Sequence, residues 1–405
     1  MRILILAGWY PNLENPMKGI FVREQAFALA KAGLPVAVFY PFDEAIKPRE
    51  MKLQSEESIP VYRANTLGSK SRYLARFISY FTALQRLGEV VKLFQPDIIH
   101  VHVGYPAGIV AYLFTRHHKI PYVITEHMSY LQDYVAKWQH RILLTRAFEK
   151  AAFVLPVSQA LAEQIKSFGW KVKMKPVPNV VDTERFTPTS PGQQTKQQTK
   201  NPTLKDQGET LGMIRLLFAG NMEETQIKGV QYLLPAFAQV CQEAAPQTLH
   251  LDLVGEGVKR AVYEELAKQL GISACCTFHG RVDPRDMPEL YRRSDFVILP
   301  SLKETFGCVL IEGLATGKPV LATVCGGPQS IVNEKVGLLV QPGSTKDLVQ
   351  GMKKMLTTLD QYKSDEIRQY AVSNYSAQAL GVRLKEIYSK VLMLPISNLT
   401  RRKEP

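Results

Sequence analysis

The chain of 405 residues lacks features that would place it in several large functional classes. It has no uninterrupted apolar run of the about 18 to 20 residues that a membrane-spanning helix needs. The apolar start, Met1–Ala7, is followed by Gly-Trp-Tyr-Pro rather than by a cleavage site, so we expect a first β-strand instead of a signal peptide. These absences favour a cytoplasmic protein.

Cysteine and metal-binding patterns are also scarce. The five cysteines are odd in number and form no Cys-x-x-Cys, so the sequence indicates neither a disulfide framework nor a structural zinc site. Asp-x-Asp, a common device for holding a divalent ion against a diphosphate, does not occur. Arg260 stands where a three-glycine dinucleotide fingerprint would need its last glycine, which argues against a nicotinamide enzyme. We expect no cofactor and no bound metal.

Acidic residues are fewer than basic ones, 37 against 50, which gives a net charge of +13. A surplus of this size predicts an anionic partner, which could be membrane lipid, nucleic acid or a phosphorylated substrate. No nucleic-acid-binding motif occurs, so we expect no nucleic-acid partner and assign the charge to anionic lipid and phosphorylated substrates.

The length suits two domains, and apolar strands alternate with helical patterns throughout, as in parallel α/β proteins. Met1–Gly8 is echoed by Met213–Gly220, each an apolar strand that ends in Ala-Gly. This repeat predicts two Rossmann-like domains that each begin with such a strand. The predicted parts are a first domain at 1–186, a polar low-complexity linker at 187–212, a second domain at 213–376, and a final helix and tail at 377–405.

The segment 300–320 carries the strongest functional pattern. A short buried strand is expected just before it, at 295–299, and is followed by a loop and by a helix at 307–315 that Gly317 terminates. The backbone amides of Phe306, Gly307 and Cys308 would lie at the helix N-terminus, where unpaired N–H groups and the helix dipole suit a phosphate.

Glu304 and Glu312 lie in the same segment, eight positions apart. Along a helix this separation is about 12 Å, which is comparable to the reach of a nucleotide sugar from hexose to ribose. One carboxylate could then hold sugar hydroxyls and the other ribose hydroxyls. Taken alone, the two glutamates would also fit an amphipathic helix with one solvated and one capping residue.

The full run resembles the donor site of the retaining family 4 glycosyltransferases. Its pattern is Pro-Ser, two residues, Glu, one residue, Phe-Gly, four residues, Glu, and then Gly-x-Pro-Val. The resemblance implies the GT-B fold, with two Rossmann-like domains facing across a cleft and a C-terminal helix crossing back to the first domain. It also implies that Glu304 contacts the transferred sugar and Glu312 the ribose.

Other donor-site motifs of the family are partly retained. The family usually has Gly-Arg after the first strand of the second domain and then Lys-Gly, with both cations on the diphosphate. Here Asn221 replaces the arginine while Lys228 is kept, so the resemblance assigns the leaving diphosphate to Lys228. It places Val282 near the nucleotide base. Gln329 stands where the family often has a glutamate after Gly-Gly-Pro.

In the first half the resemblance is weaker. Gly19 is the one glycine left of the pair that in the family covers the donor phosphates, and His127 ends a strand where the family places a histidine beside the hexose and acceptor. A lone histidine at a strand end can equally be structural. His100 and His102 share one face of a strand, but without a third ligand nearby they do not indicate a metal site.

The segment 70–86 is basic and aromatic with helical spacing. Its apolar residues could face a membrane surface, flanked by Arg72, Arg76 and Arg86, or they could pack on the first domain. Both interpretations remain open, so the expected location is cytoplasmic with a peripheral position on the inner membrane face as one alternative.

The sequence therefore predicts a metal-independent hexosyltransferase that moves a sugar from a nucleotide-diphosphate donor to an envelope polysaccharide or lipid-linked acceptor. In the front-face mechanism that the resemblance implies, the leaving phosphate accepts the acceptor's proton. Two alternatives stay open. A glycoside hydrolase would need Glu304 and Glu312 to flank one bond at about 5 to 9.5 Å, and a non-catalytic GT-B module would bind nucleotide sugar without turnover.

Overall fold

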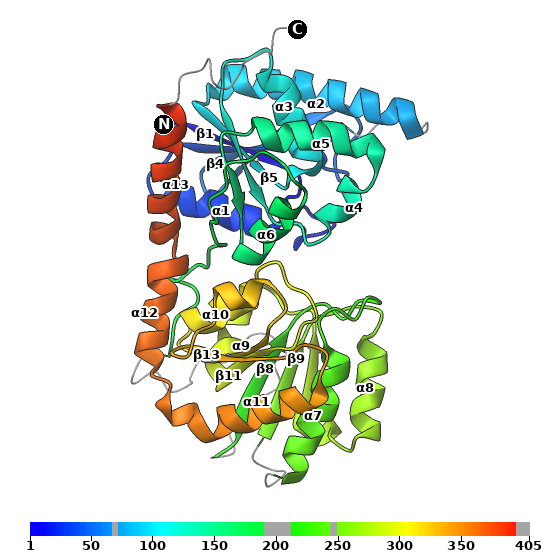
Figure 1. The fold of residues 1–405 in the computed structure, drawn as a ribbon, viewed down its shortest axis with the longest axis vertical. Coiled ribbons are helices and arrows are strands. Elements are labelled where there is room, and N and C mark those ends of the chain that lie inside the picture. The colour runs from blue at the N-terminus through cyan, green and yellow to red at the C-terminus, as the bar shows by residue number, and fades with distance from the viewer. Residues whose placement is uncertain (67–71, 190–211, 244–248, 394–405) are drawn as a thin grey trace. The chain divides into compact units, whose positions relative to one another are not determined.

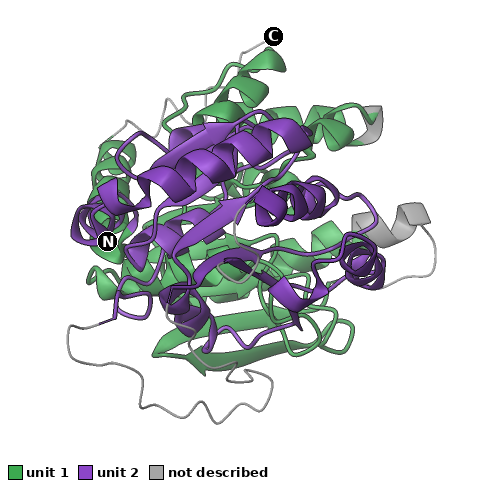
Figure 2. Ribbon diagram, turned by 90° about the horizontal axis from the view of Figure 1, so that it is seen from below, with its two compact units in different colours: residues 1–180, 376–405 green, residues 181–375 purple. Residues whose placement is uncertain are grey.

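The computed structural model describes residues 1–66, 72–189, 212–243 and 249–393, with the backbone alone at 72–77 and 138–139. Unit 1 comprises residues 1–180 and the C-terminal segment from Ser376, and unit 2 comprises residues 181–375 (Figure 2). Most of the predicted linker, residues 190–211, lies outside the described residues.

Unit 1 contains a seven-stranded sheet that is parallel except at one edge. In sheet order the strands are β3 (Met51–Glu56), β4 (Ile59–Ala64), β2 (Val36–Tyr40), β1 (Ile3–Ala7), β5 (Ile98–His102), β6 (Tyr122–Glu126) and β7 (Val154–Pro156). All five residues of β1 are buried, as expected for a parallel strand covered on both faces. The edge strand β3 pairs antiparallel with β4 and exposes most of its side chains.

Helices cover both faces of this sheet (Figure 1). They are α1 (Ile20–Lys31), α2 (Arg72–Phe94), α3 (Ile109–Thr115), α4 (Leu131–Val135), α5 (Trp138–Lys150), α6 (Gln159–Ser167) and α13 (Ala377–Leu392). The helix predicted at 70–86 is therefore longer than expected. Its inward-facing residues are Ser79, Ala83, Leu87 and Val90, whereas Phe81, from the predicted apolar face, is 54% exposed.

The last helix, α13, belongs to unit 1 although it follows unit 2 in the chain. Ser376 caps it by accepting a hydrogen bond from the Ala379 amide, and Leu380, Leu384 and Ile387 bury its apolar stripe. A Cβ on Gly381 would lie 2.4 Å from that of Ala32, so glycine allows α13 to pack closely on the end of α1. The predicted return of the C-terminal helix to the first domain is confirmed.

Unit 2 contains a six-stranded parallel sheet. In sheet order the strands are β10 (Cys276–Gly280), β9 (Leu249–Val254), β8 (Ile214–Ala219), β11 (Phe296–Leu299), β12 (Val320–Thr323) and β13 (Gly337–Val340). Numbered within the sheet, this order is 3-2-1-4-5-6, which is that of a Rossmann sheet. Both echoed strands, β1 and β8, begin their units and lie inside their sheets, so the prediction from the repeat is confirmed.

Within the residues that the structure describes, unit 2 also contains α-helices. They are α7 (Val230–Glu243), α8 (Arg260–Gln269), α9 (Met287–Arg293), α10 (Cys308–Ala315), α11 (Thr345–Thr358) and α12 (Ser364–Tyr375). A hydrophobic core cluster in this unit contains side chains of the sheet, of α7 and of α11, such as Phe237, Leu348 and Met352. No helix in the part of the chain that the structure describes is long and apolar enough to cross a membrane.

Candidate functional site

The strand order of unit 2 marks where a ligand would bind. The chain reverses its direction across the sheet between β8 and β11, and open parallel sheets bind ligands outside the carboxyl ends of the strands at such a switch point. The loop after β8 contains Asn221 and Lys228, and the loop after β11 contains Glu304. The fold therefore brings the predicted diphosphate and sugar residues to one place.

Two close backbone contacts hold these loops together. Gly229 has a φ of +74°, and a Cβ there would lie 2.0 Å from the carbonyl oxygen of Pro300. The Leu302 amide donates a hydrogen bond of 2.7 Å to the carbonyl of Ile227. Glycine is therefore required beside Lys228 both for the backbone angle and for the contact. Gly229 of the Lys-Gly pair therefore allows the two loops to pack closely.

Lys228 and Glu304 form an ion pair. Lys228 Nζ donates a hydrogen bond of 2.5 Å to Oε1 of Glu304, and the hydroxyl of Ser301 donates to the same oxygen over 2.8 Å. The Lys228 side chain is 33% exposed and that of Glu304 is 12% exposed, so the pair borders solvent. Ser301 is a residue that sequence reasoning did not single out, although the Pro-Ser motif contained it.

The N-terminus of α10 lies directly after this loop. Gly307 is its N-cap with a φ of +105°, a backbone conformation that side chains rarely adopt. Phe306 is buried, with its ring edge-on to Tyr375, and Cys308 is the first helical residue. The predicted helix start at residue 307 was therefore one residue early, and the three residues lie at the helix N-terminus as expected.

The loop that contains Gly326 and Gly327 packs against the loop that carries Glu304. Glu304 and Gly326 form an isolated parallel β-bridge, and a Cβ on Gly327 would lie 2.3 Å from the Cα of Phe306. Gln329 accepts a hydrogen bond of 2.6 Å from the Gly326 amide through its side-chain oxygen. The Gly-Gly-Pro motif therefore shapes the backbone around Glu304, and Gln329 closes the turn where the family often has a glutamate.

Glu312 lies on α10 and is held by a buried tyrosine. The hydroxyl of Tyr291, on α9, donates a hydrogen bond of 2.5 Å to Oε2 of Glu312. Burial and the neighbouring Glu312 carboxylate raise the pKa of Tyr291 well above its usual value, so the hydroxyl stays a donor. Sequence reasoning did not identify the role of Tyr291 in orienting Glu312.

Asn221 and Val282 lie on the loops after β8 and β10. Asn221 is exposed and follows Gly220, whose Cβ would lie 3.4 Å from the Lys228 stem. Val282 is half-buried in the loop where the Arg281 amide donates to Glu256 over 3.2 Å. Both lie after the carboxyl ends of their strands, on the ligand side of the sheet.

In unit 1 the corresponding switch point lies between β1 and β5. The Gly8 amide donates a hydrogen bond of 2.8 Å to the carbonyl of His102 there. Gly19 ends the loop after β1 with a φ of +70°, and a Cβ on it would lie 2.6 Å from the Trp9 carbonyl. Glycine is needed because the start of α1 passes directly over the backbone of the loop's first residues.

His127 follows β6 and is buried against other rings. Its Nε2 lies 3.1 Å from Nδ1 of His102, and its ring stacks on Phe21 with centroids 4.2 Å apart. Burial lowers the pKa of His127 to about 3, so its imidazole is neutral near neutral pH. A side-chain hydrogen bond with Asn179 opposes this pKa shift. A neutral imidazole ring can hydrogen-bond a ligand but cannot act as a cationic acid.

Glu126, beside His127, was missed by sequence reasoning. Its carboxyl group accepts hydrogen bonds from the amides of Gly104, His127 and Met128. Burial raises the pKa of Glu126 to about 7, although these three bonds oppose the rise. The available signal was an acidic residue at the end of a fully buried strand.

Aromatic rings continue from His127 along the carboxyl edge of the sheet. Trp9 contacts Phe21 edge-on at 6.3 Å and lies 6.1 Å from Tyr130, which is 40% exposed. Such rings offer an apolar face beside polar groups, a combination suited to binding small organic ligands.

His100 and His102 do not form a metal site together. His100 lies 2.6 Å from both the Tyr388 hydroxyl of α13 and the Thr125 hydroxyl, so it joins the returning helix to the sheet. Among the described residues no group of three or more His, Cys, Asp or Glu side chains could hold a metal ion.

Comparison with known proteins agrees with this architecture. The family model "Glycosyltransferase Family 4" matches residues 19–185, and the model "Glycosyl transferases group 1" matches residues 214–358. D-inositol 3-phosphate glycosyltransferase of Corynebacterium urealyticum is 26% identical, and the match covers 98% of this chain and 97% of that protein. Putative teichuronic acid biosynthesis glycosyltransferase TuaC of Bacillus subtilis is 25% identical over 87% and 89% of the two chains.

Among solved structures, HepE from Anabaena in complex with UDP superposes with a TM-score of 0.73 at 20% identity, covering 96% of this chain and all of that one. The likeness shows the GT-B fold. The two family models fall on the two units and together cover most of the chain. This protein belongs to the family 4 glycosyltransferases and has the GT-B fold.

Proposed function

We propose that this glycosyltransferase moves a hexose from a nucleotide-diphosphate donor to an envelope polysaccharide or lipid-linked acceptor, with retention of anomeric configuration and without a metal ion. The observation that carries the proposal is the Lys228–Glu304 ion pair at the switch point of unit 2. The cation can stabilise a departing diphosphate, and the carboxylate can accept hydrogen bonds from the hydroxyls of a sugar.

Lys228 neutralises the leaving diphosphate in this mechanism. Its ammonium group is a compact charge on a flexible stem, so it can exchange the Glu304 oxygen for a phosphate oxygen when a donor arrives. The N-terminal amides of Phe306, Gly307 and Cys308 add hydrogen-bond donors for the same phosphates. Asn221 contributes a neutral hydrogen bond in place of the family's arginine, and we assign Gly19 to the donor phosphates as well, as the family resemblance implies.

The sugar and the nucleoside have separate partners. Glu304, once released by Lys228, accepts hydrogen bonds from hydroxyls of the transferred sugar. Glu312, oriented by Tyr291, accepts hydrogen bonds from the ribose, and the backbone near Val282 contacts the base. His127 orients a sugar hydroxyl through its neutral imidazole ring. The leaving phosphate takes the proton of the acceptor hydroxyl, so no protein nucleophile is required.

The relatives support the substrate classes. TuaC is described as a teichuronic acid biosynthesis enzyme, which is the basis for an envelope polysaccharide acceptor, and HepE was solved with UDP, which is the basis for a nucleotide donor. Peripheral binding to an anionic membrane rests on the net charge of +13 and on α2, where Phe81 is exposed. Arg86 of that helix pairs with Glu89, and the side chains of Arg72 and Arg76 lie outside the described residues.

The test is a turnover assay with a panel of nucleotide sugars and glycan acceptors, with and without chelator. Release of nucleoside diphosphate together with formation of a new glycosidic bond supports the proposal, and NMR of the product shows whether the anomeric configuration is retained. Cleavage of glycans without a nucleotide would instead establish a hydrolase. Tight binding of nucleoside diphosphates without turnover of any panel member would establish a binding module.

A further inference from the structure

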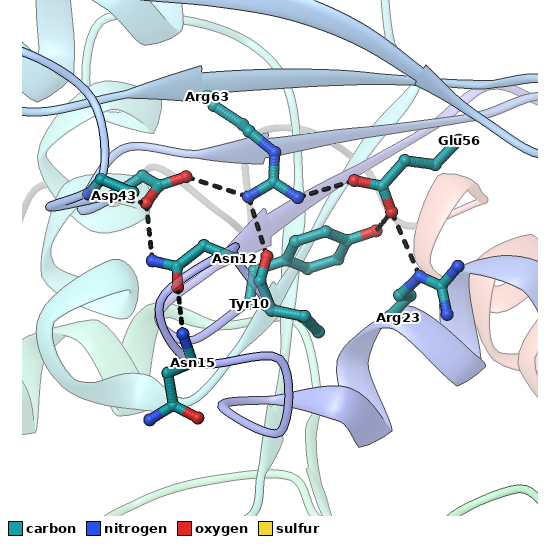
Figure 3. Close-up of polar contacts among 9 residues, drawn as sticks. Tyr10, Asn12, Asn15, Arg23, Asp43, Glu56 and Arg63 are labelled. Atoms are coloured by element: carbon teal, nitrogen blue, oxygen red, sulfur yellow. Dashed lines mark hydrogen bonds and ion pairs between the residues drawn. The ribbon is translucent and has the colours of Figure 1, made fainter. Parts of the chain in front are cut away.

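A connected set of polar side chains ties the edge hairpin of unit 1, β3 and β4, to the loop after β1 (Figure 3). We name the set the hairpin network, and its members are Tyr10, Asn12, Arg23, Asp43, Glu56 and Arg63.

Arg63, on β4, is the centre of this network. Its side chain is 8% exposed, and its guanidinium donates over 2.9 Å to Asp43 and over 2.6 Å to Glu56. Burying a guanidinium is costly unless carboxylates and hydrogen bonds compensate its charge, and here two carboxylates do so. A third hydrogen bond of 2.8 Å goes to the carbonyl of Pro11, in the loop after β1.

Three successive loop residues are held by this centre. The Tyr10 hydroxyl donates to Glu56 over 3.3 Å, and its ring lies 5.2 Å below the Arg63 guanidinium. Pro11 accepts the hydrogen bond from Arg63, and the Asn12 amide donates to Asp43 over 2.8 Å. The network therefore fixes the first part of the loop, whereas Leu13 beyond it is 98% exposed.

The other end of the loop is held as well. Arg23, in the first turns of α1, donates to Glu56 over 3.2 Å and lies 3.8 Å from Glu57. Glu56 therefore joins Tyr10 at the start of the loop to Arg23 just beyond its end. Gly19, between them, packs on the Trp9 backbone.

The hairpin turn next to Glu56 has a strained backbone. Glu56 pairs with Ile59, so the turn has two residues, Glu57 with a φ of +45° and Ser58 with a φ of +72°. Glycine or asparagine usually fills these left-handed positions, since other side chains adopt them at a cost. This two-residue turn sets the position of Glu56, and the contacts of Glu56 with Tyr10, Arg23 and Arg63 depend on that position.

The loop that the network holds bears on the candidate site. Trp9 precedes Tyr10, and Phe21 at the start of α1 stacks on His127. We propose that Arg63 is a positioning residue: through Asp43 and Glu56 it fixes the loop from Trp9 to Gly19 in the form that donor binding requires. This inference rests on the proposed function for its kinetic consequence, but the placement of the loop can be measured without turnover.

The test compares Arg63→Lys with Arg86→Lys. Lysine keeps the charge but cannot reach Asp43, Glu56 and Pro11 at once. Arg86, on α2, donates to Glu89 and to the Arg49 carbonyl outside the network, so it is the matched control. The protein has three tryptophans. Fluorine NMR of the protein labelled with 5-fluorotryptophan reports on each, and Trp9→Phe assigns the Trp9 signal.

We expect Arg63→Lys to shift the Trp9 resonance and leave that of Trp170 in place, to speed hydrogen exchange of residues 10–19, and to raise the donor KM roughly tenfold. Partial unfolding would move all tryptophan signals and leave KM unchanged. Where Arg63→Lys does not fold, Asn12→Ala removes one tie and should shift Trp9 in the same direction by less.

A Trp9 resonance or a donor KM that keeps its wild-type value in the Arg63 variant overturns the inference, and so does an equal effect of Arg86→Lys. Wild-type protein that turns over no nucleotide sugar rejects the proposed function instead. In that case the Trp9 resonance and the exchange rates still decide whether Arg63 fixes the loop.

Discussion

Lys228 and Glu304 share one hydrogen bond of 2.5 Å at the carboxyl edge of the sheet in unit 2, although 75 residues separate them in the chain. Each is the partner that neutralises the other before a donor arrives. Binding a nucleotide sugar would exchange this internal pair for two external contacts, so the pair keeps both charges compensated in the free protein.

Glu304→Ala should abolish transfer while the protein stays folded, because a carboxylate on the reacting sugar acts in the transition state. Glu312→Ala should mainly raise the donor KM, because ribose contacts are similar in the ground and transition states. Steady-state kinetics and a thermal unfolding curve check both, with the exposed Glu334→Ala as control. Near-normal turnover of Glu304→Ala would remove this residue from the site.

Lys228→Ala should lower kcat/KM by a factor that corresponds to about 2.7 to 4 kcal/mol of lost transition-state stabilisation. This loss is comparable to that of one preorganised hydrogen-bond donor. Transfer by the wild-type protein should persist in excess chelator, since Lys228 supplies the positive charge. The exposed neighbour Lys303→Ala is the matched control and should be neutral. Activity that chelator removes and magnesium or manganese restores would contradict this account.

Gly327→Ala should damage the site without introducing any polar change. The new Cβ would lie 2.3 Å from the Phe306 Cα, so the loop that carries Glu304 must move, at a cost of about 1 to 3 kcal/mol. Gly88→Ala, on α2, would place its Cβ at an ordinary 3.8 Å from Phe114 and should be neutral or slightly stabilising. Chemical denaturation and the donor KM of both variants test the contrast.

Acidification should destabilise unit 1 through its buried histidines. Burial lowers the pKa of His100 and His127 to about 3 and that of His102 well below its usual value, so the unfolded chain binds more protons below about pH 6.5. Each histidine then lowers the free energy of unfolding by about 1.4 kcal/mol per pH unit as the pH falls towards 4.5.

Glu126 should oppose this effect. Burial raises its pKa to about 7, so between about pH 4.5 and 7 the folded state binds its proton and stability from this group grows as the pH falls. Glu126→Gln should therefore steepen the loss of stability on acidification by up to about 1.4 kcal/mol per pH unit. Denaturant unfolding of both proteins from pH 4.5 to 7 measures the slopes, and equal slopes would refute the assignment.

The local patterns were enough to predict the fold class and most of the candidate residues. The alternation of apolar strands and helices, the repeat of Met1–Gly8 in Met213–Gly220, and the spacing around Glu304 are properties of neighbouring residues. Strand and helix periodicity depend on which faces are buried, so they are readable along the chain. The sequence also predicted that Gly307 lies at a helix N-terminus.

Tertiary structure alone decided which distant residues meet. Motif spacing predicted separate roles for Lys228 and Glu304, and only the placement of β8 beside β11 puts their side chains in contact. Other contacts also join residues far apart in the chain. They are the hydrogen bond of Tyr291 to Glu312, the stacking of Phe21 on His127, and the contacts of Arg63. Partners of this kind depend on strand order and on close approach between loops, which no local spacing of residues encodes. The sequence therefore determined the elements and the chemistry that they carry, whereas packing of the sheets determined the pairing of charges and rings.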